Sequence, residues 1–232
     1  MKKILTTLFL IVSVCSFANA EKIKNTLMTS STVVWAGLDY SMVRMVGYET
    51  TDASYSFTAP KTIFPGMLEK WNQLFLDERV DAVSAALGKK VLVDIHGVTE
   101  RNKTASTNQI FLSAHIGDVI NEPNITPMNI IDEVRLYKME NTNGLGLVFI
   151  VDKLVESSFT ARAHSQNCGV VYVVFFDVAT RELISAERQV YEVRSGSNFR
   201  NFWFGPIKDA DSSLIKFQPA KKPLVPITPR SR

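Results

Sequence analysis

The chain has 232 residues, of which 46% are hydrophobic and 10% aromatic, and its formal net charge is +3 at pH 7. That length and composition can bury the core of a single domain. Four of the positive charges lie, without any acid, in residues 218–232, and two more are Lys2 and Lys3, so residues 21–217 carry about −3. A nucleic-acid-binding protein would carry a basic face on its folded part, so no nucleic acid partner is expected.

Residues 1–20 are typical of an export signal. Two lysines precede an apolar run over residues 4–14, and Ala18-Asn19-Ala20 supplies the small residues of a cleavage site. The run is too short to span a bilayer permanently, which takes about 20 residues. We expect cleavage after Ala20 and a periplasmic or secreted protein. A lipoprotein acylated at Cys15 is the alternative, which the preceding Val14 fits poorly.

Cleavage would leave one cysteine, Cys168, so no internal disulfide is possible and stability must come from a packed core. The short basic signal and the lack of disulfides suit a bacterial envelope. Asn102 and Asn124 each begin a glycosylation sequon, but this pattern is common by chance and a structural role is favoured for both.

The first elements alternate between strand and helix. Residues 32–47 are rich in Val, Met and aromatics and predict a strand region with a bulge at Gly37. Within residues 64–90, apolar side chains three and four apart predict a helix, which Gly88 ends. Residues 91–98 are expected to form a short strand, buried on both faces, that leads into a polar break.

The middle of the chain is less uniform. Residues 109–120 are ambiguous, because the run is too short to separate strand from helix by its period. A second helix is predicted to begin with Thr126 as cap and Pro127 in its first turn. It should stop at the turn-forming cluster 141–144.

Strands dominate the last part. Residues 145–163 predict a long strand, and residues 169–193 predict a hairpin whose turn is formed by Asp177. The aromatic spacing of residues 199–217 is helical, and Pro206 is expected to kink that helix or start a second one.

The predicted fold class is α/β (α+β): a mixed sheet with packed helices, in the order strand, helix, strand, helix, strand, β-hairpin and C-terminal helix. Residues 21–217 form one domain in this interpretation. Residues 218–232 are rich in proline and basic residues, and we expect them to be disordered.

A metal site is the first candidate chemistry. Period two on a strand would place Asp94 and His96 on one face, and His115 with Asp118 would add two ligands. No cysteine pair or HExxH motif supports this site. A histidine with a local hydrogen bond is therefore favoured at position 96, and no metal ligand is predicted.

Nucleophilic chemistry has less support. Cys168 lies four residues from His164 in an apparent polar turn, where an unpaired loop thiol is the favoured interpretation. No Gly-x-Ser-x-Gly elbow or phosphate-binding loop is present. Four carboxylates lie within or beside the predicted strands: Asp39, Asp94, Asp152 and Asp177. They would have to converge in space to act as general acid and base, and aspartates at strand ends usually cap turns instead. No catalytic residue and no cofactor is predicted.

An aromatic cluster near the C-terminus is the candidate contact surface. Phe199, Phe202 and Trp203 share the helical stripe, which favours core packing. Phe204 lies off that stripe and is the better candidate for a partner contact, with Trp203 beside it.

The segment "VYVVFFDVATRELISAERQ" resembles the hairpin of bacterial envelope domains related to the amino-terminal domain of TolB and to the curli-secretion lipoprotein CsgG. The predicted order of elements over residues 30–217 is similar to theirs, and "FRNFW" resembles a group of uncharacterised exported bacterial proteins. Arg181 stands where those families usually carry Gly. The resemblance implies an assembly or interaction domain, and it carries over no catalytic residue.

The sequence thus predicts an exported, non-enzymatic envelope protein whose partners are other envelope proteins. The alternative is a small metal-dependent hydrolase or metal-binding protein that uses Asp94 and His96. The basic tail, residues 218–232, would add a weak and salt-sensitive contact with anionic surfaces.

Overall fold

The structure is a computed structural model that describes residues 25–26, 29–47, 66, 68–105, 110–112, 123–155, 168–192 and 199–217. Several expectations lie outside these residues: the signal over residues 1–20, the histidines His115 and His164, and the tail 218–232. Among the described helices, none combines the length and apolar composition that a membrane crossing requires.

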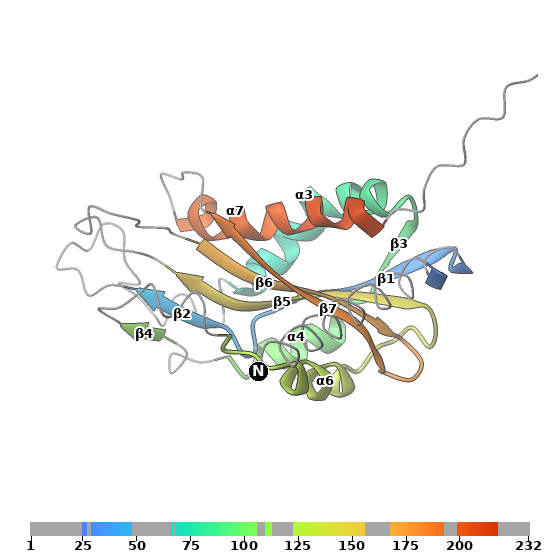
Figure 1. Cartoon of the computed structure of the whole chain (residues 1–232), viewed down its shortest axis with the longest axis horizontal. Coiled ribbons are helices and arrows are strands. Elements are labelled where there is room, and N and C mark those ends of the chain that lie inside the picture. Colours follow the sequence, from blue (N-terminus) through green and yellow to red (C-terminus); the bar gives the residue numbers. More distant parts are fainter. Residues whose placement is uncertain are drawn as a thin grey trace, which may run out of the picture.

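The described residues form one mixed sheet between two layers of helices (Figure 1). Helices α3 and α7 cover one face, and α4 and α6 cover the other. This arrangement confirms the α+β fold class predicted from the sequence. The strands are β1 (Thr32–Asp39), β2 (Arg44–Gly47), β3 (Lys90–Val93), β4 (Ile110–Leu112), β5 (Leu145–Val155), β6 (Cys168–Asp177) and β7 (Leu183–Glu192). The helices are α3 (Leu68–Leu87), α4 (His96–Asn102), α6 (Pro127–Leu136), α7 (Phe199–Ser212) and the 3₁₀ helix η3 (Ser213–Phe217).

Strand β5 is the centre of the sheet. One of its sides pairs along the whole strand with antiparallel β6. Two parallel strands share its other side: β1 pairs with residues 145–150 and β2 with residues 153–155. β3 pairs with β1 and β4 pairs with β2, both in parallel. On this side of β5, the sheet therefore has two rows of strands. β1 and then β2 form the row next to β5, and β3 and then β4 form the outer row. Each row has a gap between its two strands.

The core has two halves, one on each side of the sheet. Between the sheet and α3, the ring of Trp35 stacks on Phe75 at 4.5 Å and meets Phe149 edge-on at 4.9 Å. On the opposite side, Ile130 and Val134 of α6 pack with Phe176 of β6. β5 and most of β6 are buried along their length, so helices cover both faces of these two strands.

Local signals determine where several elements begin and end. α3 ends at Gly88, which has a φ of +63°. α6 begins with Thr126 and Asn129 in a reciprocal capping box, as the Thr126 cap predicted. The bulge expected in the first strand is present, because the pairing of β1 with β5 shifts between Trp35 and Gly37.

Pro206 was expected to kink the helix or to start a second one. Helix α7 continues through Pro206 as one helix, which excludes the second alternative. The proline ring lies against β6: a Cβ added to Gly169 would come within 2.5 Å of the Cβ of Pro206. Because residue 169 is a glycine, the ring of Pro206 packs directly on β6. A longer side chain at this position would hold α7 away from the sheet.

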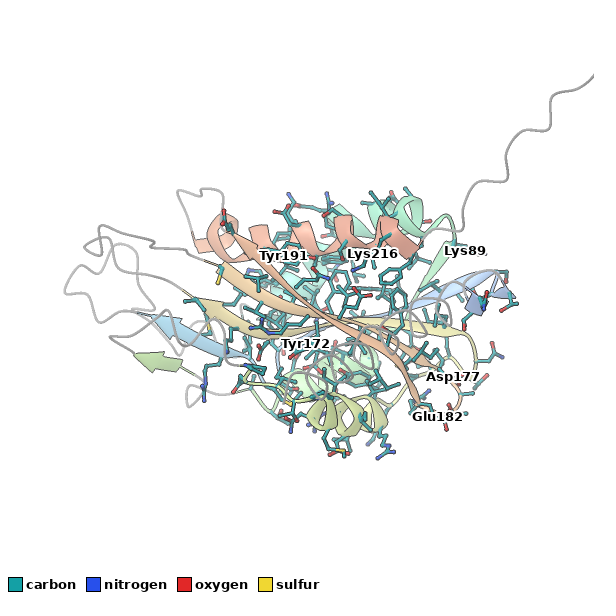
Figure 2. All side chains as sticks on the ribbon, in the orientation of Figure 1. Lys89, Tyr172, Asp177, Glu182, Tyr191 and Lys216 are labelled. Carbon is teal, nitrogen blue, oxygen red and sulfur yellow. The ribbon has the colours of Figure 1, made fainter. Side chains whose placement is uncertain are left out.

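The hairpin between β6 and β7 is a structural turn, as predicted. Oδ1 of Asp177 accepts hydrogen bonds from the backbone N–H groups of Ala179 at 2.9 Å and Thr180 at 2.8 Å. Figure 2 shows Asp177 and Glu182 at this end of the sheet. Arg181 has a φ of +60°, the conformation that favours glycine, and its side chain donates to the carbonyl oxygen of Tyr137 at 3.1 Å.

The segment after α3 differs from the prediction. The strand expected over residues 91–98 ends at Val93, and its burial is that of an edge strand. His96 begins α4, which continues to Asn102 through residues expected to form a polar break. The apolar residues of this segment therefore belong to two elements, of which the second is only seven residues long.

Gly97 permits a close approach between α4 and the chain that follows α6. A Cβ at this position would lie 2.7 Å from the backbone nitrogen of Lys138. We expect Gly97→Ala to lower the free energy of unfolding by about 1–3 kcal/mol, because the backbone must shift to admit the methyl group.

The matched control for this variant is Gly205→Ala inside α7, where an added Cβ meets nothing within 4 Å. It should leave stability unchanged or raise it by up to about 1 kcal/mol, since alanine is the better helix former. Urea unfolding of both variants checks the pair, and equal effects would contradict the close approach at Gly97.

Candidate functional site

The candidate site is the gap where the two rows of short parallel strands are interrupted. β1 ends at Asp39 and the chain resumes as β2 at Arg44. The neighbouring row stops at Val93 and resumes as β4, and α4 follows β3 in the chain. Ligand sites in open α/β sheets commonly lie at the carboxyl ends of parallel strands, so this gap is where a binding or catalytic site is expected.

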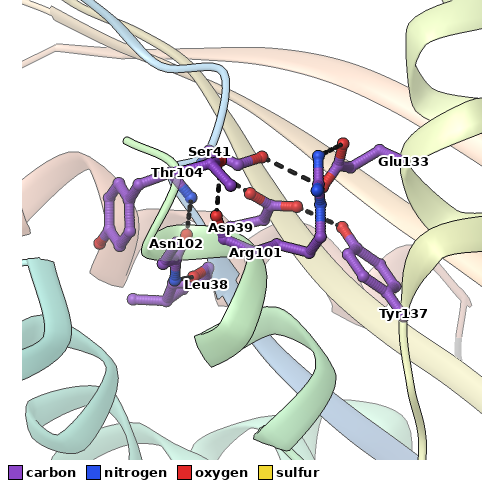
Figure 3. Close-up of polar contacts among 9 residues, drawn as sticks. Leu38, Asp39, Ser41, Arg101, Asn102, Thr104, Glu133 and Tyr137 are labelled. Atoms are coloured by element: carbon purple, nitrogen blue, oxygen red, sulfur yellow. Dashed lines mark hydrogen bonds and ion pairs between the residues drawn. The ribbon is translucent and has the colours of Figure 1, made fainter. Parts of the chain in front are cut away.

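Asp39 is the central side chain of the gap and is completely buried. Its Oδ1 accepts a hydrogen bond from the backbone N–H of Ser41 at 2.7 Å, and its Oδ2 accepts one from the hydroxyl of Tyr137 at 2.5 Å (Figure 3). Burial raises the pKa of Asp39 to about 6, and the negative charge of Glu133 adds to the rise against these hydrogen bonds. Burial also raises the pKa of Tyr137 well above its ordinary value.

An ion pair between the two lower helices lies beside Asp39. Arg101 of α4 donates from Nε and Nη2 to the two carboxylate oxygens of Glu133 of α6, at 2.5 and 2.9 Å (Figure 3). The hydroxyl of Ser41 also donates to Glu133, at 3.2 Å. Glu133 is buried, whereas the side chain of Arg101 is 28% exposed. This pair joins α4 and α6 to the residues between β1 and β2.

Two asparagine side chains replace the strand that is missing beside the end of β1. Asn72 of α3 accepts from the backbone N–H of Leu38 and donates to its carbonyl oxygen, both at 2.8 Å. Asn102 of α4 donates to the same carbonyl at 2.8 Å and accepts from the N–H of Tyr40 at 2.6 Å. Gly37 leaves room for this contact, because an added Cβ would lie 3.0 Å from Oδ1 of Asn72.

A buried carboxyl with a raised pKa is a common catalytic feature. In this gap, however, each carboxylate oxygen of Asp39 and Glu133 accepts a hydrogen bond from the protein itself. The arrangement neutralises buried charge and completes backbone hydrogen bonding, which are structural roles.

Asp152 forms a second buried cluster, at the bulge of β5. Its Oδ1 accepts from the backbone N–H groups of Asn124 at 3.1 Å and Ile125 at 3.0 Å. The hydroxyl of Tyr172 donates to the carbonyl of Ile125 at 2.9 Å, and Arg188 lies 3.7 Å from Oδ2 of Asp152. Burial raises the pKa of Asp152. This cluster holds the chain immediately before α6.

The structure separates the acids that the sequence offered as candidates. Each of the four accepts hydrogen bonds from its own local partners, and among the described residues none is hydrogen-bonded to another of the four. They are Asp39, Asp94, Asp152 and Asp177.

The shared strand face of Asp94 and His96 is not present. Asp94 follows the end of β3, and its Oδ2 accepts from the backbone and side-chain nitrogens of Asn141 at 2.7 and 2.9 Å. Its Oδ1 is buried without a hydrogen-bond partner among the described residues. His96 is exposed at the start of α4. No group of three or more His, Cys, Asp or Glu within the described ranges is arranged to hold a metal ion.

Two further predictions require correction. Phe204 is only 2% exposed and belongs to the core beneath α7, so its ring does not face a partner in this conformation; the side chain of Trp203 lies outside the described part. Cys168 begins β6 and is 1% exposed, not part of a polar turn. Burial raises the pKa of its thiol to about 11, which leaves it unreactive at neutral pH.

Sequence reasoning missed the two asparagines and the Arg101–Glu133 pair. A signal was present for Asn72, which stands on the apolar face of α3 beside Trp71 and is just as buried. Asn102 begins a sequon for which a structural role is predicted, and its burial and hydrogen bonds agree with that role.

No protein-family model matches the chain, and no curated protein sequence is similar to it. One similar solved structure is a dodecamer of PelC, in a single-substitution variant, from Paraburkholderia phytofirmans, with 10% sequence identity and a TM-score of 0.30. The match covers 83% of this chain and 90% of that chain. A TM-score this low supports no conclusion about fold or function. The resemblance to the TolB and CsgG domains stays a prediction, since these comparisons do not test it.

The raised pKa of Asp39 predicts a pH dependence of stability. The folded state favours the protonated acid, so the stabilisation is complete below the unfolded pKa of about 3.8 and is lost as pH rises through about 6. We expect Asp39→Asn, which stays neutral, to gain on the order of 2–3 kcal/mol relative to the natural chain between pH 4 and pH 7.5. Urea unfolding across this range gives the difference, and parallel curves would show that Asp39 does not titrate in this way.

The Arg101–Glu133 pair predicts an asymmetric response to mutation. Arg101→Gln leaves the buried Glu133 charge without its cation and should cost about 3 kcal/mol or more. Glu133→Gln should cost less, because the partly exposed Arg101 reaches water.

The control for this pair is Arg135→Gln, which removes an exposed ion pair with Asp132 on the same helix. Its effect should stay within about 0.5 kcal/mol. Thermal or urea unfolding measures all three variants, and an equal cost for Arg101→Gln and Arg135→Gln would contradict the buried role of Glu133.

Proposed function

We propose that this chain is an exported envelope protein that acts by binding other proteins and does not catalyse a reaction. The observation that carries the proposal is that the buried acids of the molecule are used within the fold. Asp39, Glu133 and Asp152 are buried, and their hydrogen bonds hold β1, the lower helices and the chain before α6. A hydrolytic site would need at least one such group directed toward a substrate.

The shape of the sheet supports the same proposal. β7 lies at one side of the sheet, and no described strand pairs with its outer edge. Edge strands of this kind are common sites of protein contact, because their free N–H and C=O groups accept another strand. The signal-like residues 1–20 support export.

Cross-linking in intact cells tests the proposal. The full chain is produced with its own first twenty residues, the intact cells are treated with an amine-reactive cross-linker, and the envelope fraction is then isolated. We expect N-terminal sequencing to begin at Glu21 and cross-linked species to migrate above the mature chain, which is lighter than the 26.0 kDa of the full sequence. The same treatment after denaturation is the control. A chain retained in the cytoplasm, or only the uncross-linked monomer in the envelope, would contradict the proposal.

A further inference from the structure

The outer edge of β7 carries an ordered pattern of side chains. The strand is ten residues long and pairs with β6 on its inner side alone among the described strands. In Figure 1 it crosses in front of β5 and β6. An edge strand of this length normally carries features that prevent or direct pairing with another chain.

The register with β6 shows which side chains share a face of β7. Residues directly opposite one another in an antiparallel pair lie on the same face. Arg188 lies opposite Tyr172, which belongs to the core half between the sheet and α6. Val190 and Glu192 lie two and four residues further along β7, on the same face as Arg188. These three side chains therefore lie on the α6 side of the sheet.

The side chains on the other face of β7 contact α7 and η3. Glu187 forms an ion pair with Lys216 of η3, and Tyr191, which lies opposite Gly169, packs against the core half beneath α7. Figure 2 shows both Tyr191 and Lys216 on the side of the sheet that α7 covers. The α6-side residues Arg188, Val190 and Glu192 thus form a separate row, with Val190 46% exposed at its middle.

The charges of this row become complementary to those of a second copy when a two-fold axis passes through Val190. When a strand pairs with a second copy in antiparallel fashion, a two-fold axis passes through one residue position and residues equally distant from it face each other. With the axis at Val190, each Arg188 faces a Glu192 of the second copy. The two exposed valines meet at the centre, and on the other face Gln189 meets Tyr191.

Other positions of the axis lack this complementarity. An axis at Glu187 or at Arg188 would place like charges directly opposite each other, which is destabilising. An axis at Gln189 would set the charge of Arg188 against Val190. Among these positions, the axis at Val190 places opposite charges face to face on both sides of an apolar contact.

We propose that β7 is an interface between two copies of this chain, which join their sheets through an antiparallel ladder over residues 188–192 centred on Val190. This inference rests on the proposed function and names one partner of that binding surface. In this dimer Arg188 keeps its ion pair with Asp152 and its hydrogen bond with Tyr172 and adds Glu192 of the second copy. The ladder is short and its ion pairs lie near the surface, so the dimer is weak and weakens further with added salt.

Disulfide trapping captures even a weak dimer. Residues facing each other in an antiparallel pair have Cα atoms about 4.5–5.5 Å apart, within the range that a disulfide spans. Val190→Cys in the full chain should therefore form a covalent dimer on mild oxidation. Ile215→Cys is the matched control, because Ile215 is exposed on η3 away from this row and the variant retains the same native cysteines.

Analytical ultracentrifugation gives an independent readout. Val190→Arg places two guanidinium groups at the axis and should abolish a concentration-dependent dimer that the natural chain and Ile215→Arg both form. Circular dichroism confirms that both variants are folded.

Two outcomes would overturn the inference. One is no more trapping with Val190→Cys than with Ile215→Cys. The other is a dimer that survives Val190→Arg. In either case the proposed function stands if envelope cross-linking still recovers a different protein, so the two failures are distinguishable.

Discussion

The fold depends on how β1 leaves the sheet after Asp39 and returns as β2. At this point backbone N–H and C=O groups lose their strand neighbour, and unpaired buried groups of this kind cost about 1–3 kcal/mol each. Asn72 from the upper layer and Asn102 from the lower layer form the missing hydrogen bonds at Leu38 and Tyr40. Because the two asparagines reach the same strand end from opposite faces, the gap joins all three layers.

The acids near the gap follow from the same constraint. Asp39 turns the chain through Ser41 and reaches Tyr137, while Glu133 balances the charge of Arg101. Buried charge is costly unless it is paired, and this cluster pairs it within the fold. The side chains that most resemble catalytic groups therefore hold the layers together, and the surface proposed to bind a partner lies elsewhere, along β7. This division supports a binding role over a catalytic one.

Local chemistry was predictable from the sequence, and long-range chemistry was not. The turn at Asp177 and the cap at Thr126 depend on residues within four positions of each other, and both are confirmed. The prediction for the segment after Val93 was wrong. The apolar run over residues 91–98 contains both the end of β3 and the start of α4, so it looked like one strand. The gap was missed for a different reason: Asn102 and Tyr137 lie 62 and 98 residues from the groups they bond, so no local pattern reports their contact.

The enclosure of Asp39 within the fold is the property from which these structural roles follow. Its most direct test is the carboxyl ¹³C chemical shift of Asp39, followed by NMR from pH 3 to pH 8 and assigned by comparison with Asp39→Asn. We predict a single titration with a pKa of about 6, raised by burial and by the nearby Glu133 charge. A pKa near the ordinary value of about 4 would show that water reaches this carboxylate and would contradict the enclosed gap.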